Sequence, residues 1–163
     1  MIKKLLTSAV IAAALFSASA QAENLRIPAT GVPAATIVSP DEWAALVTDR
    51  NGILLYTADH SASLTVTIET ERGALDAMAA KMMKKLGNTP PKSIGAITVS
   101  GFHGSMYDSS RAGNVYPTKS RLILVRIDDA HVATALLITL ARMDAKHYAI
   151  AKGALDTLKL TAK

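Results

Sequence analysis

The sequence predicts an α+β fold in which an antiparallel β-sheet is flanked by helices. Two observations support this class. Segments with alternating apolar and polar residues follow one another in groups, and the clearest helical periodicity lies in two segments, one mid-chain and one near the end. Strands and helices that are grouped along the chain, rather than alternating one by one, are typical of α+β domains with an antiparallel sheet.

The first part of the chain predicts an extended lead-in and then a short helix. Residues 23–38 contain two prolines and a glycine and are expected to be extended. In Ser39-Pro40-Asp41-Glu42, serine can cap a helix, proline fits its first position, and glutamate three residues after the cap completes a capping box. The inner side of this predicted helix carries Trp43, Leu46 and Val47.

Two strands and the best helix of the chain are predicted next. Strands are expected at Ile53–Thr57 and Leu64–Glu69, after the turn dipeptide Asn51-Gly52. Gly73–Leu86 is predicted to be an amphipathic helix, with lysines near its end and Gly87 to terminate it. Its apolar stripe consists of Leu75, Met78, Ala79, Met82 and Leu86.

The second half of the chain returns to β-structure. Strands are predicted at Ile94–Ser100, Ser105–Asp108 and Arg121–Ile127, with a polar loop at Ser109–Thr118. Residues 131–141 fit helical spacing and strand alternation almost equally, and Thr134, Ile138 and Thr139 favour a strand. The last predicted element is a helix at Asp144–Leu158.

The N-terminus has the layout of a secretory signal peptide. Two lysines precede an apolar stretch, Leu5–Phe16, and small residues follow up to Ala20-Gln21-Ala22, an A-x-A cleavage site. The apolar stretch is shorter than the roughly 20 residues that span a bilayer. We therefore expect residues 1–22 to be removed near Ala22, which leaves residues 23–163 as a single periplasmic or secreted domain with no transmembrane segment.

Composition excludes several classes of function. Without Lys3 and Lys4, 16 of the 18 basic residues remain against 13 acidic ones, a net charge of +3 that gives no case for nucleic-acid binding. The chain has no cysteine, so core packing alone must hold the exported domain together. Thiolate-zinc, iron–sulfur and cysteine-nucleophile chemistry are excluded for the same reason.

The order of these elements resembles the PsbP-like superfamily, which includes the DcrB-like envelope proteins. The segments that carry the resemblance are Pro40-Asp41-Glu42-Trp43, the two strands that end at Glu69, the helix Gly73–Leu86, the passage Ile97–Gly104 and the closing Ala154–Leu160. The resemblance implies an α/β/α sandwich, in which helices flank the sheet. It also implies a binding, assembly or chaperone-type module rather than an enzyme, and it supplies no cofactor and no ligand residues.

Loops and strand ends supply the candidate binding residues. The stretch Gly101–Arg111 holds His, Ser, Asp, Tyr and Arg within eleven positions, and polar groups on a rigid scaffold are typical of binding surfaces. A further histidine follows Asp59 in the connection between the first two strands. The candidate binding residues are His60, His103, Tyr107 and Arg111.

The leading hypothesis is an exported, non-catalytic binding or accessory module that recognises a protein or envelope component through one face of its sheet. An immunity-type inhibitor of an exported toxin and a chaperone are variants of it. One alternative is a small hydrolase that uses His103 with Ser105 or Asp108, although the G-x-S-x-G elbow is missing. The other is a periplasmic metal-binding protein, although the four histidines have no metal-ligand spacing and the methionines at helical spacing fit a core. We expect no cofactor and no catalytic residue.

Overall fold

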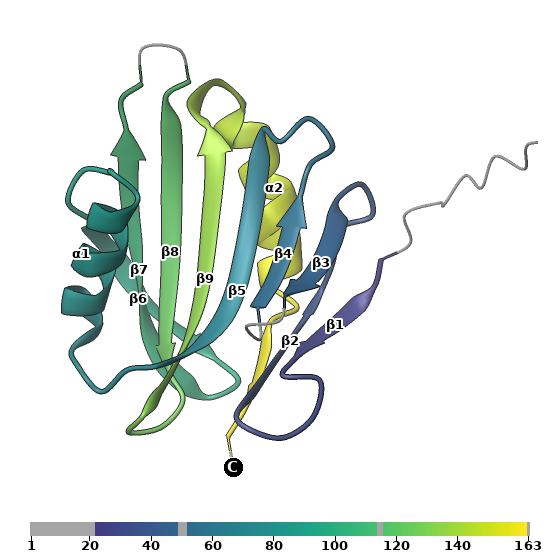
Figure 1. Cartoon of the computed structure of the whole chain (residues 1–163), viewed down its shortest axis with the longest axis vertical. Coiled ribbons are helices and arrows are strands. Elements are labelled where there is room, and N and C mark those ends of the chain that lie inside the picture. The colour runs from purple at the N-terminus through teal and green to yellow at the C-terminus, as the bar shows by residue number, and fades with distance from the viewer. Residues whose placement is uncertain (1–21, 49–51, 114–115, 163) are drawn as a thin grey trace, which may run out of the picture.

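The computed structural model describes residues 22–48, 52–113 and 116–162, which form two antiparallel sheets and two α-helices (Figure 1). The larger sheet has seven strands, each antiparallel to its neighbours. In spatial order they are β3 (Ala44–Thr48), β4 (Gly52–Tyr56), β5 (Ala62–Thr70), β9 (His131–Leu140), β8 (Thr118–Arg126), β7 (Phe102–Arg111) and β6 (Lys92–Val99). The predicted α+β class, with an antiparallel sheet flanked by helices, is confirmed.

A second, three-stranded sheet joins the two ends of the domain. It consists of β1 (Asn24–Ile27), β2 (Ala34–Val38) and β10 (Lys159–Thr161), with β2 in the middle. The lead-in that the sequence predicted as extended is therefore paired β-structure. The last strand was missed, because the predicted final helix ran on to Leu158, whereas the helix ends at Leu155.

The helices cover opposite faces of the large sheet. Helix α1 (Leu75–Lys85) packs on β7 and β8 at one side of the sheet. Helix α2 (Asp144–Leu155), preceded by a short 3₁₀ turn (Ala141–Met143), packs on β9 and on β2. Within the part of the chain that the structure describes, one layer therefore contains α1 alone, and the layer on the other face combines α2 with the small sheet, which the predicted sandwich did not include.

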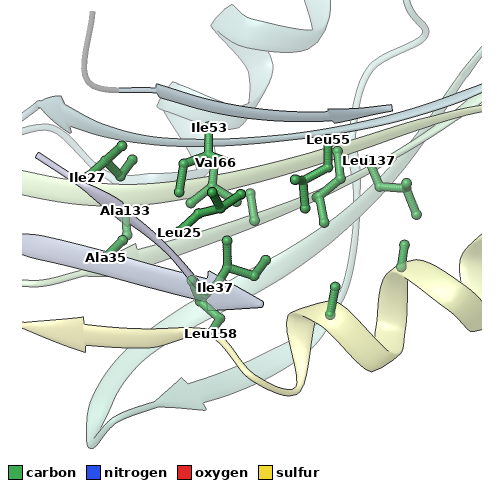
Figure 2. Packing of buried hydrophobic residues seen from close by; sticks show 14 of the residues in the cluster. Leu25, Ile27, Ala35, Ile37, Ile53, Leu55, Val66, Ala133, Leu137 and Leu158 are labelled. Atoms are coloured by element: carbon green, nitrogen blue, oxygen red, sulfur yellow. The ribbon is translucent and has the colours of Figure 1, made fainter. Parts of the chain in front are cut away.

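Two apolar clusters hold these layers together. The larger cluster lies between the large sheet and the layer of α2 and the small sheet, and brings together side chains such as Ile37, Ile53 and Leu137 (Figure 2). The smaller cluster lies under α1. It consists of Met78, Ala79, Met83, Tyr107, Leu122, Leu124 and Val132. Because β8 is covered on both faces, its central residues form a continuous apolar run rather than an alternating one.

Most of the predicted elements are present, including α1, β4, β5 and β6. The ambiguous segment 131–141 is strand β9, which pairs with β5 on one side and β8 on the other. The polar loop at Ser109–Thr118 is shorter than predicted, since β7 continues to Arg111 and β8 begins at Thr118. The signal peptide and Asn51 of the predicted turn lie outside the described residues, apart from Ala22.

The short helix predicted after Ser39 is wrong. Ala44–Thr48 is instead edge strand β3, paired with β4 in an unbroken register. The Ser39 hydroxyl accepts a hydrogen bond from the Glu23 amide, 2.9 Å away, rather than capping a helix. Pairing with a neighbouring strand has overridden the local capping signal. Trp43 is nevertheless buried in the larger core, as the sequence predicted for this side chain.

None of the helices within the described residues is long and apolar enough to cross a membrane.

Candidate binding face

The register of the large sheet shows which side chains share the face on which α1 lies. One row, from β3 to β7, consists of Leu46, Leu54, Thr65, Leu136, Leu122 and Tyr107. Directly opposed residues in antiparallel strands project to the same face. Tyr107 and Leu122 are buried under α1, so the whole row lies on the α1 face. Its other end, on β3, β4 and β5, extends beyond the helix (Figure 1).

We call this uncovered part of the sheet the open face. Its residues are all partly or fully exposed and belong to three parallel rows across β3, β4, β5 and β9. They are Ala44, Leu46, Thr48, Leu54, Tyr56, Ser63, Thr65, Thr67, Leu136 and Ile138. At its edge Leu46 is 52% exposed, which is high for a leucine on a sheet.

None of these ten residues is charged, and the uncharged area ends at Glu69, the next residue of β5 on the same face, which accepts a hydrogen bond from Thr67. Charged residues make up 19% of the chain, so ten positions would hold about two even without the usual enrichment of charge at surfaces. The cores of protein–protein interfaces are depleted of charge and retain aromatic and apolar side chains. The open face, which combines Tyr56 and three leucines with threonines and a serine, has this composition.

A groove of about 340 Å³ lies beside the open face, between α1 and the sheet. Its apolar lining comes from Met78, Met82, Leu86 and Leu136, and Leu136 also belongs to the open face. Lys81 and Lys85 border the groove on the helix side, and Glu69 and Glu71 border it on the strand side. Flexible methionine side chains adapt to different apolar groups. The groove can therefore accept an apolar side chain of a molecule that lies on the open face.

Of the four predicted binding residues, His60 lies closest to the open face. It is exposed in the connection between β4 and β5, and its ring stacks on Tyr56 with the centroids 5.5 Å apart. Tyr56 is itself an open-face residue. His60 therefore extends the open face by one aromatic surface that also offers hydrogen-bonding nitrogens.

The other three predicted residues lie along β7 and do not form one cluster. His103 is exposed near the start of the strand, and Arg111 is exposed at its end. They are eight positions apart along the strand, which is about 26 Å at the usual rise per residue. Tyr107, between them, is buried under α1 and its hydroxyl donates to Asp76 Oδ1 at 2.5 Å. Burial, together with this carboxylate, raises the pKa of Tyr107. Binding through these residues stays a prediction.

The residues of the hydrolase alternative point to different faces of the sheet. His103 and Ser105 alternate with Asp108 along β7, so the carboxylate projects to the opposite side from both. Asp108 lies 3.6 Å from Arg121 Nε. The structure therefore separates Asp108 from His103, whereas His103 and Ser105 share one face of the sheet and their pairing stays a prediction.

A different serine and histidine, which the sequence analysis did not select, form a hydrogen-bonded chain. Ser61 Oγ lies 2.7 Å from His147 Nε2 and 2.6 Å from Asp59 Oδ1, and both Ser61 and His147 are buried. The hydrogen bond from Ser61, followed by one from Thr57, holds the pKa of Asp59 well below its usual range.

The direction of the hydrogen bonds between Asp59, Ser61 and His147 argues against a serine nucleophile. An ionised Asp59 can only accept, so the Ser61 hydroxyl donates to it and His147 must donate from Nε2 to Ser61 Oγ. A catalytic serine donates in the opposite direction, to the histidine. The chain instead fastens the β4–β5 connection to α2, where Trp43 packs edge-on against His147 with the ring centroids 6.1 Å apart.

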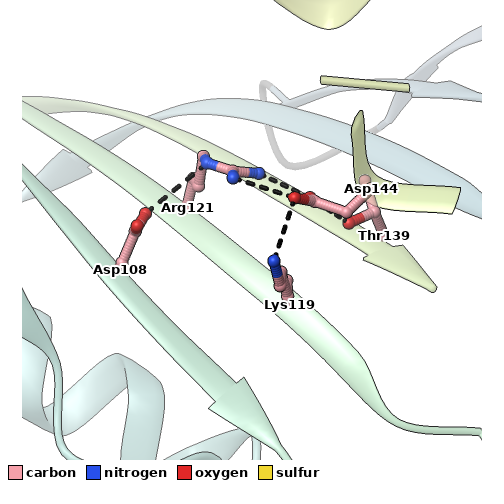
Figure 3. A network of polar contacts seen from close by, with 5 residues as sticks. All are labelled: Asp108, Lys119, Arg121, Thr139 and Asp144. Carbon is pink, nitrogen blue, oxygen red and sulfur yellow. Dashed lines mark hydrogen bonds and ion pairs between the residues drawn. The ribbon is translucent and has the colours of Figure 1, made fainter. Parts of the chain in front are cut away.

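A second polar network anchors the start of α2 to the sheet (Figure 3). Arg121 on β8 donates to both carboxylate oxygens of Asp144, at 2.5 and 2.9 Å, and Thr139 on β9 donates to the same group at 2.7 Å. These hydrogen bonds, the one from Arg121 above all, lower the pKa of Asp144 to about 2. Arg121 also lies 4.0 Å above the ring of Tyr148. Because Asp144 is buried and fully engaged, the network is structural.

The metal-binding alternative gains no ligand set within the described residues. There, no group of three or more histidine and acidic side chains is placed to hold one ion. His131 pairs with Asp128 at 2.8 Å, His147 bonds to Ser61, and the other two histidines lie on separate surfaces. Met78 is buried in the core under α1, as its helical spacing predicted. Met83, which the predicted stripe did not include, is buried beside it, and Met82 is only partly buried and lines the groove.

Comparisons with known proteins give the fold. The sequence matches no protein-family model and no curated protein. Among solved structures, cyanobacterial PsbP (CyanoP) from Synechocystis sp. PCC 6803 matches with a TM-score of 0.58 at 11% identity, over 86% of this chain and 94% of that one. LpqN, a protein involved in cell envelope biogenesis of Mycobacterium tuberculosis, matches with a TM-score of 0.54 at 21% identity, over 85% and 91% of the two chains.

The Ran-binding protein Mog1p of Saccharomyces cerevisiae matches with a TM-score of 0.55 at 13% identity, over 87% of this chain and 97% of that one. In a further match, to a Bacteroides thetaiotaomicron protein, the chain spans 46% of that protein's length. At these identities the likeness defines the fold alone. The protein has a PsbP-like fold, as the resemblance in its sequence predicted.

Proposed function

We propose that the protein is an exported, non-catalytic binding module that recognises an envelope or secreted protein through the open face. The observation that carries this proposal is a partly exposed sheet surface that holds no charge and adjoins an apolar groove. An uncharged surface of this kind is costly to leave in water and is suited to a partner with an uncharged apolar patch. The lysines and glutamates that border the groove would limit the orientation of that partner.

The comparisons and the N-terminal sequence are consistent with this function. Of the proteins with the same fold, Mog1p binds the protein Ran and LpqN takes part in envelope biogenesis. The predicted signal peptide would deliver the domain to the periplasm or the medium. The N-terminal residue of the protein isolated from its cells tests this part, since export predicts a mature chain that begins at Glu23.

Site-specific photo-crosslinking tests the binding face. We expect a photo-reactive phenylalanine at Thr65, in the middle of the open face, to crosslink one protein in intact cells. The same residue at Lys152, on the exposed side of α2, serves as the matched control.

The specificity of this crosslink comes from a second variant. Leu54→Arg places a charge on the open face next to Thr65, and we expect it to abolish the crosslink, because burying an unpaired charge opposes binding. The folded state of this variant is checked by its circular dichroism. Crosslinks of equal yield from positions 65 and 152, or a crosslink that Leu54→Arg leaves intact, would show that the open face is not the binding site.

A further inference from the structure

The two edge strands of the large sheet differ in how they are protected against pairing. Strand β6 carries Lys92, has an irregular register between Ser93 and Gly95, and follows Pro90-Pro91. A lysine, a bulge and nearby prolines are devices that stop an edge strand from pairing with another chain.

Strand β3, at the opposite edge, has no lysine and no bulge, and the proline before it, Pro40, lies four positions ahead of the strand. Ala44–Thr48 contains no charge, proline or glycine, and its register with β4 runs unbroken along the strand. Both of its faces are exposed, since Leu46 on the open face and Val47 on the other face are 52% and 48% accessible. An exposed, regular and apolar edge presents unpaired backbone groups to an incoming strand.

We propose that β3 pairs with β3 of a second copy of the chain, antiparallel and about a two-fold axis at Leu46. A strand that pairs with this edge should be short and uncharged, with apolar residues on both faces, and should itself lie at the edge of a sheet. Strand β3 of another copy meets each of these conditions. A two-fold contact of this kind is isologous and closes at the dimer. The proposal concerns the backbone edge of β3, which borders the open face, and does not depend on the partner of the open face.

Charge at the start of β3 selects the antiparallel direction. Asp41 and Glu42 are exposed just before the strand. In a parallel pair, these acids of both copies would lie side by side. In an antiparallel pair they lie at opposite ends of the strand, about 26 Å or more apart, which exceeds the screening length of about 8 Å at physiological salt.

The same geometry sets the neighbours within the pair. Leu46 faces Leu46 of the other copy, and the smaller Ala45 faces its larger Val47. No like charges meet within the strand. Opposed residues lie on the same face of an antiparallel sheet. The two open faces would therefore join into one continuous uncharged surface on a sheet of twice the width.

The absence of cysteine allows a direct test, because one introduced thiol is the only one in the chain. Opposed residues at a two-fold axis have Cα atoms about 4.5–5.5 Å apart, within the range of about 4.4–6.8 Å for a disulfide. We expect Leu46→Cys to form a disulfide-linked dimer under mild oxidation. Ile94→Cys on β6, which replaces a side chain of similar exposure (46%), is the matched control and should remain mostly monomeric.

The register is tested by Ala44→Cys. In the proposed pair Ala44 faces Thr48 of the other copy, so two thiols at position 44 are about 13 Å apart along the strands. This variant should therefore form far less disulfide than Leu46→Cys.

The non-covalent dimer is measured by sedimentation of the mature chain over a range of concentrations. Val47→Lys brings two charges close to the axis, and we expect it to raise the dissociation constant at least tenfold, whereas Ile94→Lys should leave it unchanged. The proposal is overturned if the wild-type chain sediments as a monomer up to several hundred micromolar. It is also overturned if thiols at 46 and 94 oxidise at the same rate, or if Val47→Lys leaves the dimer intact.

Discussion

Replacing Asp144 with asparagine removes the charge that anchors α2 to the sheet while keeping the size of the side chain. Asp144 is buried at the first position of α2, and accepts hydrogen bonds from Arg121 and Thr139. Asparagine can keep part of this geometry, but it leaves the Arg121 guanidinium, 21% exposed, with only the more distant Asp108, 3.6 Å from its Nε, as an acidic partner. We expect Asp144→Asn to destabilise the domain substantially.

The magnitude follows from the pKa of Asp144. Its fall from 3.8 to about 2 means that the folded protein favours the ionised carboxylate by about 2–3 kcal/mol. Breaking a buried ion pair by removing one partner costs about 3–5 kcal/mol, and partial exposure of Arg121 lowers that figure. We therefore expect a loss of about 2–3 kcal/mol in the free energy of unfolding at pH 7.

Urea unfolding followed by circular dichroism measures this loss, with Asp156→Asn, at the residue directly after the same helix, as the matched control. Asp156 pairs with Lys152, but both side chains are more than half exposed, so this substitution should have no measurable effect. Equal stability of the two variants at pH 7 would refute the assignment of a structural role to the Arg121–Asp144 pair.

The pH dependence gives an independent check with a definite sign. The pKa of Asp144 is lower in the folded than in the unfolded chain, so its contribution is complete above about pH 4 and disappears as the pH falls through about 2. The difference in stability between wild type and Asp144→Asn should therefore shrink between pH 4 and pH 2. A difference that stays constant over this range would contradict the charge-based explanation.

Two further predictions concern backbone packing and the buried serine. Gly104→Ala should lower the free energy of unfolding by more than about 2 kcal/mol, because a Cβ would lie 2.1 Å from the Leu124 carbonyl oxygen. Gly153→Ala, in the open surface of α2, should raise the free energy of unfolding by up to about 1 kcal/mol. Melting temperatures of the two variants that shift in the same direction would contradict this. Ser61→Ala should lower the free energy of unfolding by about 1–3 kcal/mol, because it leaves His147 Nε2 without a partner in the interior, and urea unfolding that matches the wild type would contradict the structural role of this hydrogen bond.

Local patterns in the sequence were sufficient for the central part of the fold. Alternation in Leu64–Glu69 predicted β5, and the apolar stripe of Gly73–Leu86 predicted α1, because each segment has one buried face and its period is visible along the chain. The α+β class and the PsbP-like likeness also followed from the order of these elements. The buried role of Trp43 was predicted although the helix assigned to its segment was wrong.

The candidate binding face was not predictable in the same way. The sequence analysis proposed one face of the sheet as the binding surface, but it had no means to choose the face or its residues. Leu46, Leu54 and Thr65 come from three strands and share a face only because of their register. The residues selected for their chemistry were grouped by closeness in sequence, and His103 and Arg111 are far apart because an extended strand separates them.

The sequence by itself determined the elements whose burial pattern is periodic, and with them the class of the fold, because a period along the chain is a local property. The tertiary structure decided which edge of the sheet is left unprotected and which half of one face α1 leaves uncovered. It also decided that Ala44–Thr48 is a strand, and that Lys159–Thr161 closes a second sheet with the N-terminal residues. These features depend on hydrogen bonds and contacts between segments far apart in the chain, which no local pattern of residues specifies.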